Sequence, residues 1–331
     1  MSAPDAVPLL RVRDLAIEFG PPDAPLRVVD GVGFDLARGE CIGIVGESGS
    51  GKSMTSLAMM RLIPEPPGRI AGGRVELEGR DLLSLPVDAM RDIRGREIAM
   101  VFQEPMSSLN PVMTIGAQIG ETLLLHDPMS PARRRERVIE MLGLVGIPSP
   151  EDRLDAYPHE FSGGMRQRVM IAMALACNPK VLIADEPTTA LDVTIQAQVL
   201  DLMKRLREQL HTAIVLISHD LGVISDIADR VIVMYCGRVV ETANIADIFE
   251  RPAHPYTEGL LRSIPSGSNS GRRLYQIPGT VPSPQDRGPG CDFYDRCPRR
   301  MPECLLAKPP LFDLGRGQAA ACYAAAREAV S

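Results

Sequence analysis

The segment Gly46-Glu47-Ser48-Gly49-Ser50-Gly51-Lys52-Ser53 is the most informative part of this 331-residue chain. It follows a short apolar run, Cys41 to Val45, and precedes apolar residues that recur at helical spacing from Met54 to Leu62. A glycine-rich turn between a strand and a helix is the phosphate-loop pattern, because its backbone N–H groups and the helix N-terminus attract anions. The stretch therefore predicts an α/β fold that binds nucleotide phosphates.

Two side chains at the end of this stretch carry the expected chemistry. Lys52 is placed to reach the β and γ phosphates, and Ser53 is placed to ligate Mg²⁺. The loop residues expected to surround the phosphates are Gly46, Glu47, Ser48, Gly49, Ser50 and Gly51. A glycine-rich turn without a ligand is the alternative, and the strand and helix predicted on either side of the loop argue against it.

Composition and charge exclude several classes of protein. Hydrophobic residues make up 45% and charged residues 24% of the chain, which are values of a globular protein and not of a disordered one. The formal net charge of -6 gives no global attraction to a phosphate backbone. Aromatic residues are only 4% with no Trp, which is too few for a base-stacking platform. Nucleic acid is therefore not an expected partner.

Membrane-spanning and secretory segments are not expected. The longest uninterrupted apolar run, Val169 to Cys177, is far shorter than the ~20 residues that a spanning helix needs. The start of the chain, Met1 to Pro8, has no basic region of the kind that opens a signal peptide. We therefore expect the chain in the cytoplasm, where cysteines stay reduced and a group of them indicates metal binding or packing.

Other apolar runs predict further strands of the α/β core. The runs Val181 to Ala184 and Ala213 to Ile217 end in polar residues, which is typical of buried parallel strands. Val231 to Cys236, followed by Gly237, predicts the first strand of a hairpin. Asp185 and Glu186 directly follow the run Val181 to Ala184. Beside a phosphate loop, the Asp185 carboxylate is suited to the Mg²⁺ hydration shell and Glu186 to polarising the attacking water.

A second anion-binding signal lies in Phe161 to Arg168. Ser162, Gly163 and Gly164 directly precede an apolar helical run, so they predict a helix N-terminus suited to a phosphate. One nucleotide cannot occupy two such sites within one chain. We therefore expect a dimer of subunits, in which each phosphate loop faces the Ser-Gly-Gly segment of the other subunit.

This ordered set of motifs resembles the ATP-binding subunits of ABC transporters over about residues 8 to 331. The resemblance implies that Gln103, after the strand-like Ile98 to Phe102, senses Mg²⁺ and the transmembrane partner. It also implies that His219 contacts the γ-phosphate. Met165 departs from the Gln that is commoner in the family, which leaves the core of the anion site intact.

Two further positions take their roles from the same resemblance. Asp192, in Ala190-Leu191-Asp192, matches the family's loop that lies across the dimer. Phe19 occupies the place of the aromatic residue that stacks on adenine, with a plain core role as the alternative.

The resemblance also implies the domain organisation. We expect an α/β P-loop NTPase fold of the ABC type, with a RecA-like core and an N-terminal antiparallel β subdomain. Residues 8–262 would form the ATPase domain, with an inserted helical subdomain at about 104–165. Residues 263–331 would form a C-terminal extension that is rich in loops up to Ala319.

The end of the chain indicates the subfamily. Arg251-Pro252-Ala253-His254-Pro255-Tyr256-Thr257 and a cysteine-bearing tail resemble the ATPases of bacterial dipeptide and oligopeptide importers. The four cysteines of the tail are Cys291, Cys297, Cys304 and Cys322. Four thiolates can hold an iron–sulfur cluster or Zn²⁺, and the lack of a close Cys-x-x-Cys pair disfavours a zinc ribbon. Since the related importers carry a [4Fe–4S] cluster, we expect one here, with Zn²⁺ or packing cysteines as alternatives.

The resemblance predicts the partners and the location. We expect a second ATPase subunit, a different chain that forms a heterodimer with this one, and two permease subunits docked on the helical subdomain near Gln103. An extracytoplasmic binding protein would deliver dipeptides or oligopeptides to the permeases. The chain would then lie on the cytoplasmic face of the inner membrane.

Other functions remain as alternatives at this point. Nickel, haem or another solute could replace peptides, because selectivity belongs to the partners. An ABC ATPase acting on DNA or ribosomes is disfavoured, since Gly46 and Ser162 lie too close in sequence for a long coiled coil and the chain holds one cassette.

Overall fold

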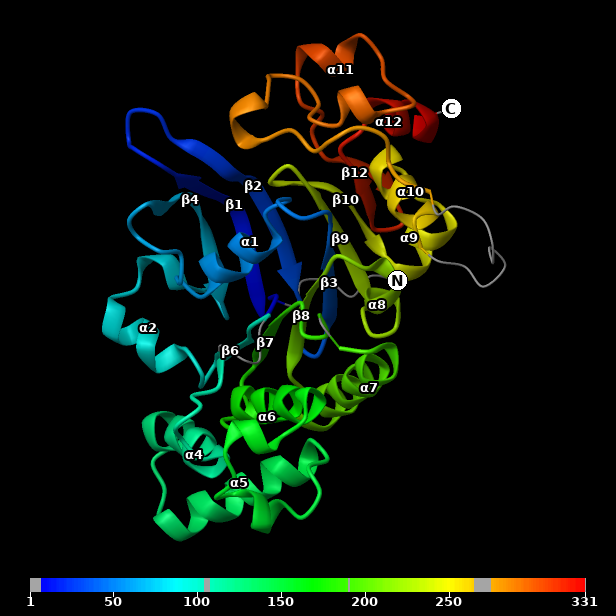
Figure 1. The fold of residues 1–331 in the computed structure, drawn as a ribbon. Helices are drawn as coiled ribbons and strands as arrows, with labels where there is room; N and C mark the ends of the chain where they lie inside the picture. The colour runs from blue at the N-terminus through cyan, green and yellow to red at the C-terminus, as the bar shows by residue number, and fades with distance from the viewer. Residues whose placement is uncertain (1–6, 104–107, 190, 265–274, 331) are drawn as a thin grey trace. The chain divides into compact units, whose positions relative to one another are not determined.

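The computed structural model describes residues 7–103, 108–189, 191–264 and 275–330. They form two compact units that alternate along the sequence. Within the described ranges, the first unit comprises residues 7–9, 36–41 and 84–217, and the second comprises residues 10–35, 42–83 and 218–330. Figure 1 shows the succession of helices and strands.

The first unit is built on parallel strands. The strands are β6 (Ile98–Val101), β7 (Val181–Asp185) and β8 (Ala213–Ser218). β7 lies between the other two, and its residue Ile183 is in register with Met100 and Val215. Every residue of β7 and β8 is buried, as expected for parallel strands that are covered on both faces. The prediction of buried parallel strands is thus confirmed.

The helices of the first unit are α2 (Val87–Ile93), α4 (Ile115–His126), α5 (Pro131–Leu144), α6 (Gly163–Leu175) and α7 (Val193–Leu210). Except for α2, which follows Pro86, they begin where the sequence supplies a capping side chain. The Thr114 and Ser130 hydroxyl oxygens accept hydrogen bonds from the first turns of α4 and α5. In α7, the residues from Val199 to Leu206 that recur at helical spacing are buried.

The described part of the region expected to be an inserted helical subdomain contains the helices α4 and α5, joined by turns and loops. α4 and α5 pack against each other, and the short turns η2 (Pro150–Arg153) and η3 (Pro158–Glu160) lead from them to α6. The start of the expected subdomain, 104–107, lies outside the described residues. Among the helices of the described ranges, none is long and apolar enough to cross a lipid bilayer.

The second unit contains an antiparallel sheet near the start of the chain. Its strands are β1 (Leu10–Phe19), β2 (Leu26–Leu36), β4 (Gly68–Leu77) and β5 (Arg80–Asp81), in the order β2-β1-β4-β5. β1 ends at Phe19, directly before Gly20-Pro21-Pro22, residues that break a strand. The carboxylate of Glu18 is buried and receives hydrogen bonds from Arg27 and Arg69, which lower its pKa.

The second unit also carries the strand that leads into the phosphate loop. β3 (Cys41–Val45) is paired in parallel with β9 (Arg230–Tyr235), which forms a hairpin with β10 (Arg238–Asn244) through Cys236 and Gly237. The predicted hairpin is therefore confirmed. The helices that follow these strands are α1 (Lys52–Met59), α8 (Leu221–Ser225), α9 (Ile245–Glu250) and α10 (Pro255–Arg262).

The tail is more regular than its loop-rich composition predicts. Its elements are η5 (Pro284–Asp286), η6 (Tyr294–Arg296), α11 (Glu303–Leu306), β11 (Phe312–Gly315), β12 (Gln318–Ala320) and α12 (Tyr323–Val330). β12 pairs with β10 and β11 pairs with β12, so the tail extends the sheet (Figure 1). The turn between β11 and β12 has positive φ at Arg316 and Gly317, as a tight hairpin turn requires.

One carboxylate joins this hairpin to the preceding helices. Glu241 of β10 is fully buried, and it accepts hydrogen bonds from the backbone N–H groups of Ala253 and His254, at 2.8 and 2.9 Å. It also accepts a 2.9 Å bond from the side-chain amide of Gln318 in β12. A buried carboxylate with three donors holds three segments together, and its removal leaves those donors without an acceptor.

We predict that Glu241→Gln lowers the free energy of unfolding by about 2–4 kcal/mol. The Gln side chain replaces one accepting oxygen with an NH₂ group, which would face N–H donors instead of an acceptor. Urea unfolding of the purified chain measures this loss. Glu250→Gln, at an exposed position nine residues later on α9, should change the stability by less than about 0.5 kcal/mol. Equal stability of both variants would contradict the structural role of Glu241.

Candidate nucleotide site

The phosphate loop runs from the end of β3 to the start of α1. It passes close to the β9–β10 turn: a Cβ atom added at Gly46 would lie 2.2 Å from the carbonyl oxygen of Met234. The N–H of Gly237 in that turn donates to the Ser50 carbonyl at 2.9 Å. Only glycine fits at position 46, which gives a packing reason for the first glycine of the motif.

The loop folds around the side chain of Lys52. The Lys52 ammonium group is buried and donates hydrogen bonds to the carbonyl oxygens of Gly46 and Glu47, at 2.7 and 3.1 Å. The buried hydroxyl oxygen of Ser50 has no hydrogen-bond partner among the described residues. A buried cation and an unpartnered hydroxyl within one glycine-rich loop fit the binding of a phosphate chain.

Two residues outside the predicted set hold this loop. The Tyr256 hydroxyl oxygen, from α10, accepts a 2.7 Å hydrogen bond from the Glu47 N–H. Arg296, from η6 in the tail, donates to both oxygens of the Glu47 carboxylate, at 2.7 and 3.0 Å. Tyr256 belongs to the segment that indicated the subfamily, but nothing in the local sequence links it or Arg296 to a loop more than two hundred residues away.

The first unit places Gln103 and Glu186 together. Asp185 is the buried last residue of β7, and Glu186 follows it with a φ of 47°, a left-handed conformation that is unfavourable for a residue with a side chain. The Glu186 carboxylate accepts hydrogen bonds from the Gln103 side-chain amide at 3.2 Å and from the Thr189 hydroxyl at 2.9 Å. The turn thus fixes the direction of the Glu186 carboxylate at the end of the strand.

The first unit also brings two capped helix N-termini together. Ser162 caps α6 and accepts a hydrogen bond from the Met165 N–H, and Asp192 caps α7 in the same way. α6 and α7 meet at this end, because a Cβ atom at Gly164 would lie 2.8 Å from the Ile195 side chain. Ser162, Gly163 and Asp192 are exposed. Ala190, the first residue of the predicted loop, lies outside the described residues.

The remaining predicted residues lie in the second unit with the phosphate loop. His219 is exposed and follows β8, next to Asp220, which caps α8. Phe19 is half-buried at the end of β1, near Gly68 of β4. The expected set is therefore divided: Gln103, Asp185, Glu186, Ser162 to Gly164 and Asp192 lie in the first unit, and Phe19, the phosphate loop and His219 lie in the second.

The prediction of an iron–sulfur cluster at Cys291, Cys297, Cys304 and Cys322 is wrong, and so is its zinc alternative. Among the described residues, no three His, Cys, Asp or Glu side chains converge in a way that could hold a metal ion. The four cysteines line a cavity of only about 10 Å³. Burial raises the pKa of Cys291 to about 12, and it also raises the pKa of Cys297 and Cys322.

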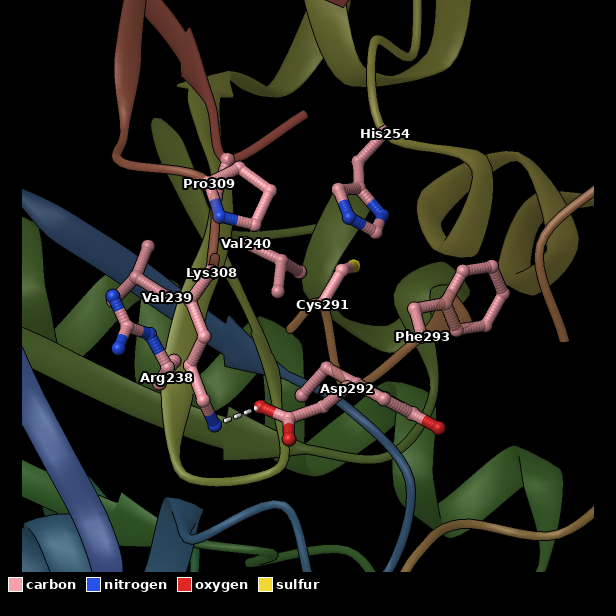
Figure 2. A pocket seen from close by; sticks show the side chains of 11 residues that line it. Arg238, Val239, Val240, His254, Cys291, Asp292, Phe293, Lys308 and Pro309 are labelled. Carbon is pink, nitrogen blue, oxygen red and sulfur yellow. Dashed lines mark hydrogen bonds and ion pairs between the residues drawn. The ribbon is translucent and has the colours of Figure 1, made fainter. Parts of the chain in front are cut away.

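A neighbouring cavity shows how these residues pack. Figure 2 shows His254 and Cys291 beside Val240 in the lining of this cavity, and Asp292 paired to Lys308. The cavity has a volume of about 20 Å³, and the ion pair has an N–O distance of 2.7 Å. His254 caps α10, because its Nδ1 atom accepts a hydrogen bond from the Tyr256 N–H. Burial lowers the pKa of His254 to about 3, so its imidazole is neutral at physiological pH and can act as this acceptor.

Comparison with known proteins places the chain in a family. The family model described as ABC transporter matches residues 29–189, and the model described as oligopeptide/dipeptide transporter, C-terminal region, matches residues 240–304. The oligopeptide transport ATP-binding protein AppD of Bacillus subtilis is 53% identical over 95% of this chain and 96% of its own length. The dipeptide transport ATP-binding protein DppD of Escherichia coli is 49% identical over the same shares of the two chains.

Solved structures share the fold of the cassette. The structure of the ATP-binding cassette MJ0796, described as a dimeric post-hydrolysis state bound to ADP and Pi, matches with a TM-score of 0.63 and 28% identity, over 71% of this chain and 98% of that chain. CbiO1 of Clostridium perfringens matches with a TM-score of 0.64 and 26% identity, over 74% of this chain and 92% of its own.

The fold and the motifs define an ABC-type ATPase of the P-loop NTPase class. The chain belongs to the family of ATP-binding subunits of oligopeptide and dipeptide ABC transporters.

We predict that His254 makes the stability of the chain depend on pH. Its pKa in the folded chain, about 3, lies below the ordinary value of 6.5, so the unfolded chain binds the proton more readily. The stabilisation is complete above pH 6.5 and is lost as the pH falls toward 3. Between pH 7.5 and 5.0, protonation of His254 in the unfolded chain should lower the free energy of unfolding by about 2 kcal/mol.

Urea unfolding of His254→Asn at the two pH values tests this prediction. Asn keeps a capping oxygen but has no imidazole to protonate, so the pH-dependent loss should shrink by about 2 kcal/mol. His159→Asn, at an exposed position of η3, should keep the full pH dependence. The same pH dependence in wild type and His254→Asn would exclude His254 as its source.

Proposed function

We propose that this chain is the ATP-hydrolysing motor subunit of a bacterial importer for dipeptides and oligopeptides. The observation that carries the proposal is the match of both parts of the chain, the cassette and the segment 240–304, to models of transporters, the second of which is specific to peptides. The relatives transport oligopeptides or dipeptides by name. Nickel or haem import has no comparable support.

Residues 8–262 constitute the ATPase domain in this proposal, with a RecA-like core, an N-terminal antiparallel β subdomain and a helical subdomain at about 104–165. The sheet of β1, β2 and β4 and the helices α4 and α5 support this division. Residues 263–331 form the C-terminal extension, and the part of it at 265–274 lies outside the described residues.

ATP with Mg²⁺ binds at the phosphate loop. Gly46, Glu47, Ser48, Gly49, Ser50 and Gly51 surround the phosphates with backbone N–H groups. Lys52 turns from the loop carbonyls that it now contacts to the β and γ phosphates. Ser53, Gln103 and Asp185 hold Mg²⁺, which supplies positive charge against the phosphate oxygens. Phe19 stacks on the adenine ring.

Hydrolysis depends on the carboxylate of Glu186. Its negative charge polarises a water molecule, and the hydrogen bonds from Gln103 and Thr189 keep the carboxylate in one direction. The strained φ of Glu186 supports this role, since strained backbone clusters at functional sites. His219 contacts the γ-phosphate and reports its loss.

A second ATPase subunit, a different chain, completes each site. Ser162, Gly163, Gly164 and Asp192 bind the nucleotide held by the phosphate loop of the partner. Their exposure at two adjacent helix N-termini supports this placement, because these termini carry partial positive charge. The dimeric state of the MJ0796 cassette is a precedent among similar structures.

Two transmembrane permease subunits dock on the helical subdomain near Gln103. Large apolar side chains are exposed there, Phe102 before α4 and Leu124 and Leu125 at its end, the last with 69% of its surface exposed. Closure of the ATPase pair around two ATP molecules drives the permeases, and hydrolysis resets them. An extracytoplasmic binding protein delivers the peptides, and this chain lies on the cytoplasmic face of the inner membrane.

We predict that Glu186→Gln preserves ATP affinity and slows hydrolysis by ~10²–10⁴-fold, because the amide keeps the hydrogen bonds but lacks the charge that polarises water. Steady-state phosphate release by the assembled transporter measures the rate. Glu208→Gln, at an exposed position of α7, serves as the control and should leave the rate unchanged. Wild-type turnover in Glu186→Gln would remove Glu186 from this role.

We predict that Ser162→Arg abolishes phosphate release by the assembled transporter and leaves ATP binding by the isolated chain intact. The bulky cation would stand where the nucleotide of the partner must approach. Ser130→Arg is a matched control, since Ser130 caps α5 as Ser162 caps α6, each accepting a 3.3 Å hydrogen bond. A loss of ATP affinity in the isolated Ser162→Arg chain would place Ser162 in the same site as Lys52 and contradict the two-subunit site.

A further inference from the structure

The tail contacts the phosphate loop through one ion pair. Both guanidinium Nη atoms of Arg296 donate to the Glu47 carboxylate, in the parallel two-bond geometry that makes arginine–carboxylate pairs strong. The two residues lie 249 positions apart, so the pair joins η6 of the tail to the second residue of the loop. It is shielded from solvent on the Arg296 side, where the side chain is only 4% exposed.

Arg296 is held in place by the rest of the second unit. Its Nε atom donates to the Pro278 carbonyl at 3.0 Å, and Nη1 also donates to the Tyr235 hydroxyl at 3.3 Å. The guanidinium lies 5.7 Å from the ring centroids of Tyr235 and Phe293. Because these contacts hold the Arg296 side chain in one position, the Glu47 carboxylate that it binds is held in one position as well.

Glu47 is bound at each of its polar groups. Its N–H donates to Tyr256, its carbonyl oxygen accepts from Lys52, and its carboxylate accepts from Arg296. Tyr256 is itself fixed, because its ring packs 4.7 Å from that of Tyr235 and 5.5 Å from that of Phe293. The loop conformation therefore depends on α10 and on the tail as well as on the glycines of the loop.

We infer that Arg296 is a positioning residue for nucleotide binding, which holds the phosphate loop in its binding conformation through Glu47. The inference rests on the proposed placement of ATP at this loop. If the loop samples other conformations without Arg296, the apparent affinity falls by the fraction of time that it is competent. Saturating ATP selects the competent conformation, so the maximal rate is retained.

The experiment compares Arg296→Gln with wild type, both as the full chain and in the assembled transporter. ATP affinity of the chain is measured by isothermal titration, and KM and kcat are measured by phosphate release. We expect Arg296→Gln to raise the dissociation constant and the KM for ATP by about 5–20-fold, with kcat within about twofold of wild type. Arg296→Lys, which keeps the charge without the two-bond geometry, should fall between them.

Arg299→Gln is the matched control. Arg299 lies three residues further along the tail, and its guanidinium binds the Ala253 carbonyl, Glu258 and Glu328 but no residue of the loop. If the tail acted on stability alone, both variants would lower the melting temperature and neither would change the KM for ATP. A normal KM in Arg296→Gln, or the same rise in Arg299→Gln, overturns the inference.

A second variant keeps the test decisive if Arg296→Gln does not fold. Glu47→Gln breaks the same pair from the loop side and should raise the KM for ATP by a similar factor, and the double variant should be no worse than either single one. A normal KM in Glu47→Gln, or additive effects, overturns the inference. Failure of the wild-type chain to bind ATP would instead refute the proposed function.

Discussion

The buried ammonium group of Lys52, between the carbonyl oxygens of Gly46 and Glu47, is the interaction on which the loop depends. It folds the loop back onto the start of α1, and this is possible because the backbone at Gly46 can approach the Met234 carbonyl without a side chain between them. A cation held in this way gives a site for phosphate at the end of β3. The position of β3 beside β9 therefore decides where a nucleotide can bind.

In the first unit, the groups that would act on the nucleotide are also held in place by the backbone around them. Each is placed at the end of a regular element, where backbone hydrogen bonding fixes it: Glu186 after β7, Ser162 at the start of α6 and Asp192 at the start of α7. In the proposed mechanism these two helix ends bind the nucleotide of the partner, because the phosphate loop of the same chain already provides one anion site for its own nucleotide. This is the physical reason why a second subunit belongs to the proposed mechanism.

The sequence predicts those parts of the fold that have a local cause. The glycine-rich loop, the buried strands β7 and β8 and the β9–β10 hairpin are set by periodicity and turn residues. The support of the loop by Tyr256 and Arg296 is not predictable in this way, since it joins residues that lie far apart in the chain. The β11–β12 hairpin did leave a signal, the Gly-x-Gly turn at 315–317, which the proline-rich composition of the tail obscured.

The four tail cysteines show what the spacing of residues in a sequence cannot establish. Their separations permitted a cluster, but spacing does not fix the direction of the side chains, and no three metal-ligating side chains of the described residues converge to hold a metal ion. The same limit applies to Glu47, which the motif presents as one more loop residue. Only the fold shows that its carboxylate joins the loop to the tail.

The most direct test of this account is the affinity of the purified full chain for ATP in the presence of Mg²⁺, measured by isothermal titration for wild type and Lys52→Met. Met keeps the length of the side chain and removes its charge, while Lys204→Met, at an exposed position of α7, serves as the control. The account predicts that wild type and Lys204→Met bind one ATP per chain and that Lys52→Met binds it at least ~10-fold more weakly, since hydrogen bonds to charged groups contribute ~1.5–3 kcal/mol. Equal affinity of Lys52→Met and wild type would contradict it.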